Sequence, residues 1–132
     1  MVWDIYDGVR TGIADYQGIP HYFSSIFQDE YTDEFELATV SERFLGLAIE
    51  QWKIFRDWEY LFHTGNENLE NHPNGGGVNK RYDEIEAIIK SELLGLTKID
   101  ATFKPEFRVL PGQDELQEGI LREIEVEWHG IT

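Results

Sequence analysis

Residues 41–63 read SERFLGLAIEQWKIFRDWEYLFH and form the longest predicted helix of the chain. At about 100° per residue, the apolar side chains cover roughly two-thirds of the helix circumference. Such an arc is wider than the single stripe of a surface helix. Ser41 is a suitable N-cap, and Gly65 suits a C-terminal stop. We therefore expect this helix to be covered on two sides, by its own chain or by a second copy in a homodimer.

One acid, Glu59, falls inside the apolar arc, between Phe55 and Trp52. A carboxylate among aromatic rings is costly unless it is paired, and His63 and Arg56 are its nearest partners along the helix. The functional interpretation makes Glu59 a general acid or base with His63 as its catalytic partner. The alternative is a structural ion pair, because such pairs also perturb carboxylates.

Four further residues are candidate binding residues. Arg56 would bind an anion beside Glu59, and Trp52 would flank Glu59. His21 alternates with a phenylalanine on a predicted strand, so it is expected to face inward, and histidine titrates near neutral pH. His72 lies in the connection after the long helix. Its spacing of nine from His63 matches no standard zinc motif, so no metal site and no cofactor are predicted.

Length and composition indicate one ordinary globular domain, residues 1–132. The chain is 41% hydrophobic and 28% charged, so it has enough apolar residues to form a core without stabilising cross-links. The absence of cysteine excludes disulfides, thiolate metal sites and a cysteine nucleophile. We see no signal peptide and no run long enough to span a bilayer, so we expect a cytoplasmic protein.

Charge is the strongest compositional feature, with 26 acids against 11 bases and a net charge of −15. Arg10 is the only base in the first 42 residues. Such a field repels nucleic acid and anionic membranes, so neither is an expected partner. A basic protein partner, a metal ion or a cationic ligand would fit this charge. The alternative is that the charge only keeps the protein soluble.

Hydrophobic alternation predicts three consecutive strands before the long helix, at 13–17, 19–27 and 35–40, joined as an antiparallel meander. Gln17-Gly18 reads as a two-residue hairpin turn between the first two strands. Residues 64–79 then change to a polar composition with three consecutive glycines. They predict a flexible connection or a lid over a pocket.

The rest of the chain predicts a shorter helix and further strands. The helix runs over 80–94 with Asn79 as its N-cap, and strands are expected at 97–104, interrupted by Pro105, and at 122–128. The last strand presents alternate glutamates, which resist edge pairing or, alternatively, bind a cation. The predicted fold class is α+β, a mostly antiparallel sheet packed on one long central helix and a second shorter helix.

The opening sequence WDIYDGVRTGIADY, residues 3–16, with the Gly18-x-Pro20-His21 that follows, resembles the start of a group of small bacterial proteins without an assigned activity. The Trp/Phe-rich helix and the closing EVEW at 125–128 are also similar. This resemblance implies a stand-alone domain, and it assigns no site residues.

Two functions compete on these observations. The first is a non-catalytic interaction or binding protein, for example an acidic neutraliser of a basic partner, as immunity proteins are. The second is a small hydrolase or lyase with a Glu59-centred pocket between helix and sheet and with the glycines at 75–77 in a lid. A cation site among the acids at 29–36 is a third interpretation, but these acids lack the ligand spacing of a calcium loop.

Overall fold

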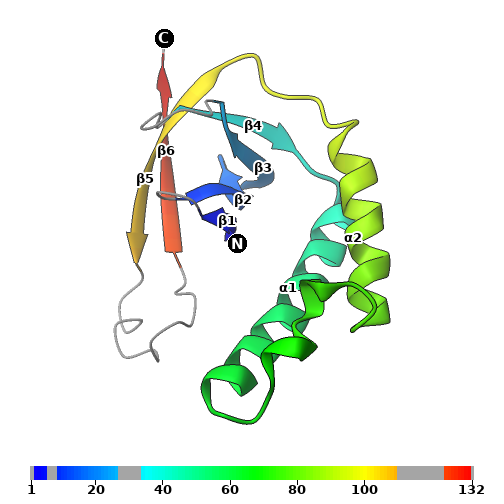
Figure 1. Ribbon diagram of the computed structural model, residues 1–132. Coiled ribbons are helices and arrows are strands. Elements are labelled where there is room, and N and C mark those ends of the chain that lie inside the picture. The colour runs from blue at the N-terminus through cyan, green and yellow to red at the C-terminus, as the bar shows by residue number, and fades with distance from the viewer. Residues whose placement is uncertain (1, 6–8, 27–33, 110–123, 132) are drawn as a thin grey trace. The chain divides into compact units, whose positions relative to one another are not determined.

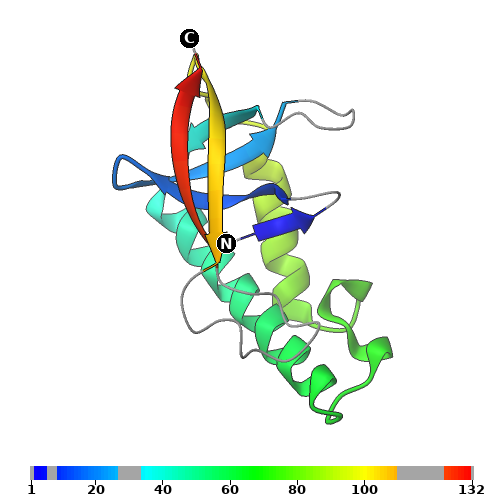
Figure 2. The same ribbon diagram turned by 90° about the vertical axis from the view of Figure 1, so that its left-hand side faces the viewer.

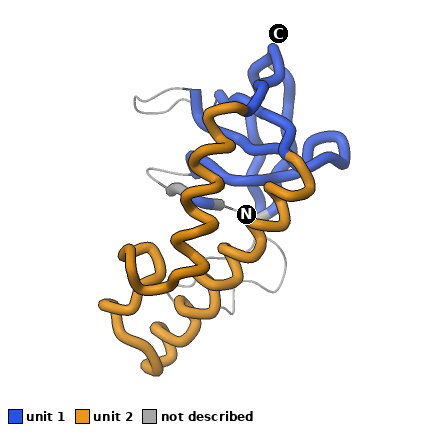
Figure 3. The backbone as a smooth tube through the Cα atoms, turned by 90° about the vertical axis from the view of Figure 1, so that its right-hand side faces the viewer, with its two compact units in different colours: residues 1–40, 96–113, 123–132 blue, residues 41–95, 114–122 orange. Residues whose placement is uncertain are grey.

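The computed structural model describes residues 2–5, 9–26, 34–109 and 124–131. The acids predicted as a cation site at 29–36 lie mostly outside this part. The chain divides into two compact units, coloured separately in Figure 3. One is a sheet unit built from residues 1–40, 96–113 and 123–132, and the other is a helical unit built from residues 41–95 and 114–122.

The sheet unit holds six antiparallel strands in the order of the sequence (Figures 1 and 2). Their bounds are β1 Val2–Ile5, β2 Val9–Tyr16, β3 Ile19–Ser25, β4 Phe35–Thr39, β5 Thr102–Val109 and β6 Ile124–Ile131. The two helices, α1 Glu42–His63 and α2 Lys80–Leu93, lie in the chain between β4 and β5. The α+β class predicted from the sequence is confirmed. The packing of the sheet on the long helix stays a prediction.

The predicted meander is confirmed and extended by β1, which the sequence analysis missed. The turn between β2 and β3 is the predicted one, since Gln17 and Gly18 have φ of 53° and 76°, the two positive values of a type I′ hairpin. This turn sets the register and places Ala14 opposite His21.

Aromatic residues form the core of the sheet unit. Phe23, Phe35, Leu37 and Phe103 are buried together. The sheet curls enough for rings on distant strands to meet, because Phe23 on β3 lies 5.4 Å from Trp128 on β6, centroid to centroid. Ring pairs at such distances add to the free energy of burial.

Strand β5 continues through Pro105, where the sequence analysis expected an interruption. Pro105 pairs with Trp128 on β6, whereas the register of β5 with β4 contains only Phe103, opposite Phe35. Among the described strands, Pro105 therefore has a pairing partner on one side of β5 only, and a missing N–H is tolerated there as it is at an edge.

The helical unit follows the predicted bounds closely. The hydroxyl of Ser41 accepts a hydrogen bond from the Phe44 amide at 3.0 Å, and the side chain of Asn79 accepts one from the Tyr82 amide at 2.9 Å. Both predicted N-caps are therefore present, and each satisfies an amide that the helix leaves unpaired. Gly65 follows α1 with a φ of 82°, the left-handed conformation expected after a helix end.

The connection after α1 is built from two short 3-10 helices, Leu69–Asn71 and Pro73–Gly75. Pro73 is buried, and the Trp58 indole donates to the Asn68 carbonyl at 3.4 Å. The Gly77 amide donates to Asp83 at the start of α2, at 2.9 Å. These contacts tie the connection to both helices.

Burial along α1 agrees only in part with the predicted wide arc. Phe44 and Ala48 are buried, but Ile49 and Leu61, which the arc includes, are exposed. Within the described ranges, no helix is both long enough and apolar enough to cross a membrane.

Candidate functional site

The predicted acid Glu59 lies buried on α1, with 7% of its surface exposed. Its Oε1 is 3.7 Å from Nε of Arg56, and the guanidinium of Arg56 lies over the ring of Trp52, 5.7 Å from the centroid. The structure thus brings together three of the predicted site residues, with a cation between a carboxylate and an indole. This arrangement satisfies the need of a buried carboxylate for a countercharge.

His63, the predicted partner of Glu59, is the last residue of α1 and is exposed. Its ring lies edge-on to Phe62, with centroids 5.2 Å apart. In the ranges that the structure describes, no hydrogen bond or ion pair joins it to Glu59. A catalytic Glu59–His63 pair therefore stays a prediction.

His72 lies between the two 3-10 helices and contacts the aromatic side chains of α1. Its ring centroid is 4.4 Å from that of Trp58 and 5.5 Å from that of Phe55. Its Nδ1 accepts a hydrogen bond from the Asn74 amide at 3.0 Å, so that nitrogen carries no proton. The residue therefore fastens the connection onto α1, where the sequence analysis saw a residue on a loose loop.

These contacts belong to an aromatic strip on α1 that consists of Trp52, Phe55, Trp58 and Phe62. Neighbouring rings lie 6.2, 6.3 and 5.0 Å apart along the strip, and all four side chains are half-buried. From the sequence, Phe55, Trp58 and Phe62 were assigned only to the apolar arc, and Trp52 was also a candidate binding residue. Their i, i+3 and i+4 spacing was the signal for a continuous strip.

His21 is buried on β3, as the alternation predicted, with 3% of its surface exposed. Its Nδ1 is 2.6 Å from the Ile19 carbonyl oxygen, so this nitrogen donates, and its ring lies edge-on to Tyr16. It faces Ala14 across the hairpin. These contacts are those of a structural histidine.

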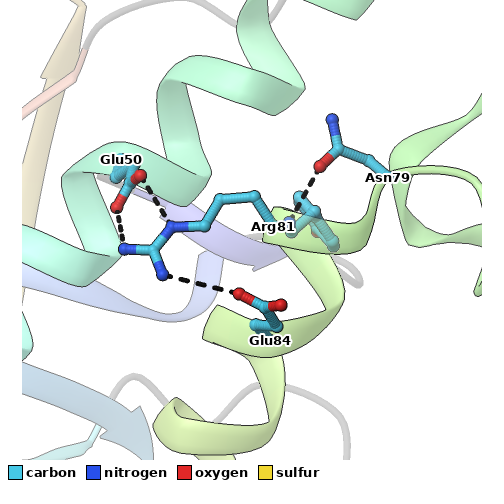
Figure 4. Close-up of polar contacts among 5 residues, drawn as sticks. Glu50, Asn79, Arg81 and Glu84 are labelled. Carbon is cyan, nitrogen blue, oxygen red and sulfur yellow. Dashed lines mark hydrogen bonds and ion pairs between the residues drawn. The ribbon is translucent and has the colours of Figure 1, made fainter.

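Charged pairs join the two helices. Arg81 on α2 makes two hydrogen bonds to the carboxylate of Glu50 on α1 and lies 3.7 Å from Glu84 (Figure 4). The hydrogen bond from Arg81 lowers the pKa of Glu50, and the same bond raises the pKa of Arg81. Arg43 on α1 forms an ion pair with Glu92 on α2 through one contact, from Nη1 to Oε1.

These pairs occupy most of the positive charge of the helical unit. Residues 41–95 contain six bases, and four of them make ion pairs. Three exposed acids of the same segment, Glu42, Asp57 and Glu70, have neither an ion pair nor a side-chain hydrogen bond within the described ranges. The exposed charge of this unit is therefore mainly negative.

Exposed apolar side chains are concentrated on the same unit. Seven large hydrophobic residues are exposed among those described, and six of them belong to residues 41–95. These six are Ile49, Tyr60, Leu61, Leu69, Val78 and Leu94. Surfaces that combine exposed apolar groups with charges are typical of protein–protein contacts.

Comparison of the chain with protein-family models, curated proteins and solved structures gave no match.

Proposed function

We propose that this protein is a non-catalytic binding protein whose partner is a basic protein. One observation carries the proposal. In residues 41–95 of the helical unit, four of the six bases are held in ion pairs, while exposed acids such as Asp57 and Glu70 have none in the described part of the chain. A surface whose unpaired charge is mainly of one sign attracts a partner of the opposite sign and speeds their encounter.

The helical unit is the proposed contact face. Its acids supply attraction at long range, and its exposed Tyr60, Leu61 and Leu69 supply the apolar area that a partner buries on contact. The aromatic strip lies on the same helix, and aromatic side chains provide much of the binding energy in protein interfaces. A homodimer through α1 would use the same exposed residues.

The net charge of −15 also supports the exclusion of nucleic acid and anionic membranes as partners. We propose a cytoplasmic location, which is consistent with a chain that contains no cysteine.

A small hydrolase or lyase is the second candidate, because Glu59 is a buried carboxylate beside Arg56. General acid–base catalysis uses carboxylates in such surroundings. The ion pair with Arg56 favours the structural interpretation of Glu59. The two functions differ in one measurable respect, since Glu59→Gln would abolish catalysis but leave the capture of a partner unchanged.

Affinity capture at graded salt concentrations tests the proposed function. The immobilised protein is exposed to an extract of the organism that encodes it, and bound proteins are eluted by increasing salt. We expect one basic protein to be captured at low salt and released as screening increases. Failure to capture any protein at low salt would contradict the proposal.

A further inference from the structure

The hairpin of β5 and β6 carries a second group of functional side chains, in the sheet unit. Glu106 lies directly opposite Glu127 in the register, and His129 is two residues beyond Glu127 on the same strand. Residues two apart on a strand point to the same face, so all three side chains share one face of the hairpin. All three are exposed.

The ligand atoms of these side chains converge. Nε2 of His129 lies 3.3 Å from Oε2 of Glu106 and 4.0 Å from Oε1 of Glu127, and one ligand atom from each residue lies within 4.8 Å of the other two. Ligands about 2.1 Å from a tetrahedral zinc ion are separated by about 3.4 Å from one another. Small side-chain rotations would therefore bring all three atoms to coordination distance.

Acids outnumber bases on this face of the hairpin, with Glu106, Glu125 and Glu127 against Lys104 and Arg108. Glu106 and Glu127 are like charges on directly opposed positions, an arrangement that destabilises an antiparallel pair unless something neutralises it. Arg108 lies 3.4 Å from Oε2 of Glu127, which leaves Oε1 directed toward His129. Lys104, opposite His129, is the other cation on this face. Arg108 therefore orients the carboxylate of Glu127. Carboxylates that bind metal ions in proteins are commonly oriented by a hydrogen bond from a neighbouring residue of this kind.

We propose that Glu106, Glu127 and His129 form a binding site for a divalent transition-metal ion, with zinc the best match. One imidazole and two carboxylates suit zinc, whereas calcium and magnesium prefer sites made of oxygen ligands alone. Three protein ligands leave the remaining coordination position to water or to a group from outside. The inference goes beyond the sequence analysis, which considered only a row of glutamates on the last strand.

Sequence reasoning missed this site because its ligands come from two strands. Glu106 follows a proline at which the strand was expected to stop, so no register was assigned across the hairpin. The Glu-x-His at 127–129 was the only local signal, and two ligands alone do not indicate a zinc site.

Isothermal titration of the untagged, chelator-treated protein with Zn²⁺ tests the proposal. We expect one ion to bind per chain and His129→Gln or Glu106→Gln to weaken binding by about tenfold or more, the range seen when metal-site residues are lost. Glu125→Gln is the matched control, because Glu125 is exposed on the same face of β6 and loses the same charge. The control should bind Zn²⁺ like the unmodified protein.

Three results would overturn the proposal. They are the absence of Zn²⁺ binding, equal binding by the His129→Gln variant, and an equal loss in the Glu125→Gln control. Titration with Ca²⁺ completes the experiment, since Ca²⁺ binding as tight as Zn²⁺ binding and independent of His129 would indicate only a diffuse acidic surface. Circular dichroism of each variant establishes that a loss of binding is not a loss of fold.

Discussion

Arg81 on α2 binds Glu50 on α1 through two parallel hydrogen bonds, from Nε to Oε1 at 2.8 Å and from Nη2 to Oε2 at 2.7 Å (Figure 4). Two-pronged contacts of this kind are the strongest form of arginine–carboxylate pairing. The contact joins the two helices. It also pairs the positive charge of Arg81, so this base does not offset the unpaired acids that the helical unit presents to a partner.

This pair predicts a pH dependence of stability. The pKa of Glu50 lies below its ordinary value of 4.5, mainly because Arg81 donates a hydrogen bond to it. A lowered pKa in the folded state stabilises the fold above the unfolded pKa, and the contribution disappears as the pH falls through the folded pKa. We expect the stability difference between the unmodified protein and Glu50→Gln to be constant above about pH 5 and to shrink below it. Urea unfolding at graded pH measures this difference.

Asp57→Asn is the control for that experiment, because Asp57 is an exposed acid of α1 without an ion pair in the described ranges. An identical pH dependence for the two variants would mean that the contact between Arg81 and Glu50 makes no specific contribution to the pH dependence of stability.

The N-cap of α1 predicts a measurable loss when its hydroxyl is removed. Ser41 accepts a hydrogen bond from the Phe44 amide, so Ser41→Ala leaves that amide without its partner. Such substitutions cost about 1 kcal/mol of the free energy of unfolding. Ser91→Ala, at an exposed position within α2, should cost less than half as much. Urea unfolding compares the two variants, and equal losses would argue against the cap.

The aromatic core of the sheet unit predicts a much larger effect. Phe23 is 2% exposed and contacts the rings of Phe35 and Trp128. Removing a buried phenylalanine side chain costs about 3–5 kcal/mol, through lost burial and the cavity left behind. We expect Phe23→Ala to destabilise the protein by this amount and Phe23→Leu by less. Ile19→Ala, on the same strand but 53% exposed, should be close to neutral. Thermal and urea unfolding would show whether this order holds.

Arg56 provides a test of the buried carboxylate. Arg56→Gln removes the cation that lies 3.7 Å from the buried carboxylate of Glu59. We expect a cost of about 1–3 kcal/mol, since removing one partner of a buried ion pair is destabilising. Lys53→Gln, an exposed base of the same helix, should change stability little. A smaller loss for Arg56→Gln than for Lys53→Gln would show that the pair with Glu59 is not structural.

The helices were predictable from the sequence because their signals are local. Ser41 and Asn79 mark the starts of α1 and α2, and the apolar period runs between cap and stop. The hairpin turn at Gln17-Gly18 was predictable for the same reason, since two adjacent residues specify it.

The contacts that depend on distant residues were not predictable in this way. Strand β1 is short, and its pairing with β2 is irregular, so no clean alternation marks it. The partner of His72 is Trp58, across a connection whose glycines suggested flexibility. The meeting of Glu106 with His129 needs the register of β5 and β6, which the sequence does not state.

Salt-dependent capture with charge variants tests the central claim, that exposed acids of the helical unit bind a basic protein. The bait variant Glu42→Gln/Asp57→Asn/Glu70→Gln removes three such acids. Asp15→Asn/Asp100→Asn/Glu125→Gln removes three exposed acids of the sheet unit and matches the change in charge. We predict that the first variant loses the partner at a lower salt concentration than the unmodified protein and that the second retains it. Equal retention by both variants, or equal loss, would contradict the claim.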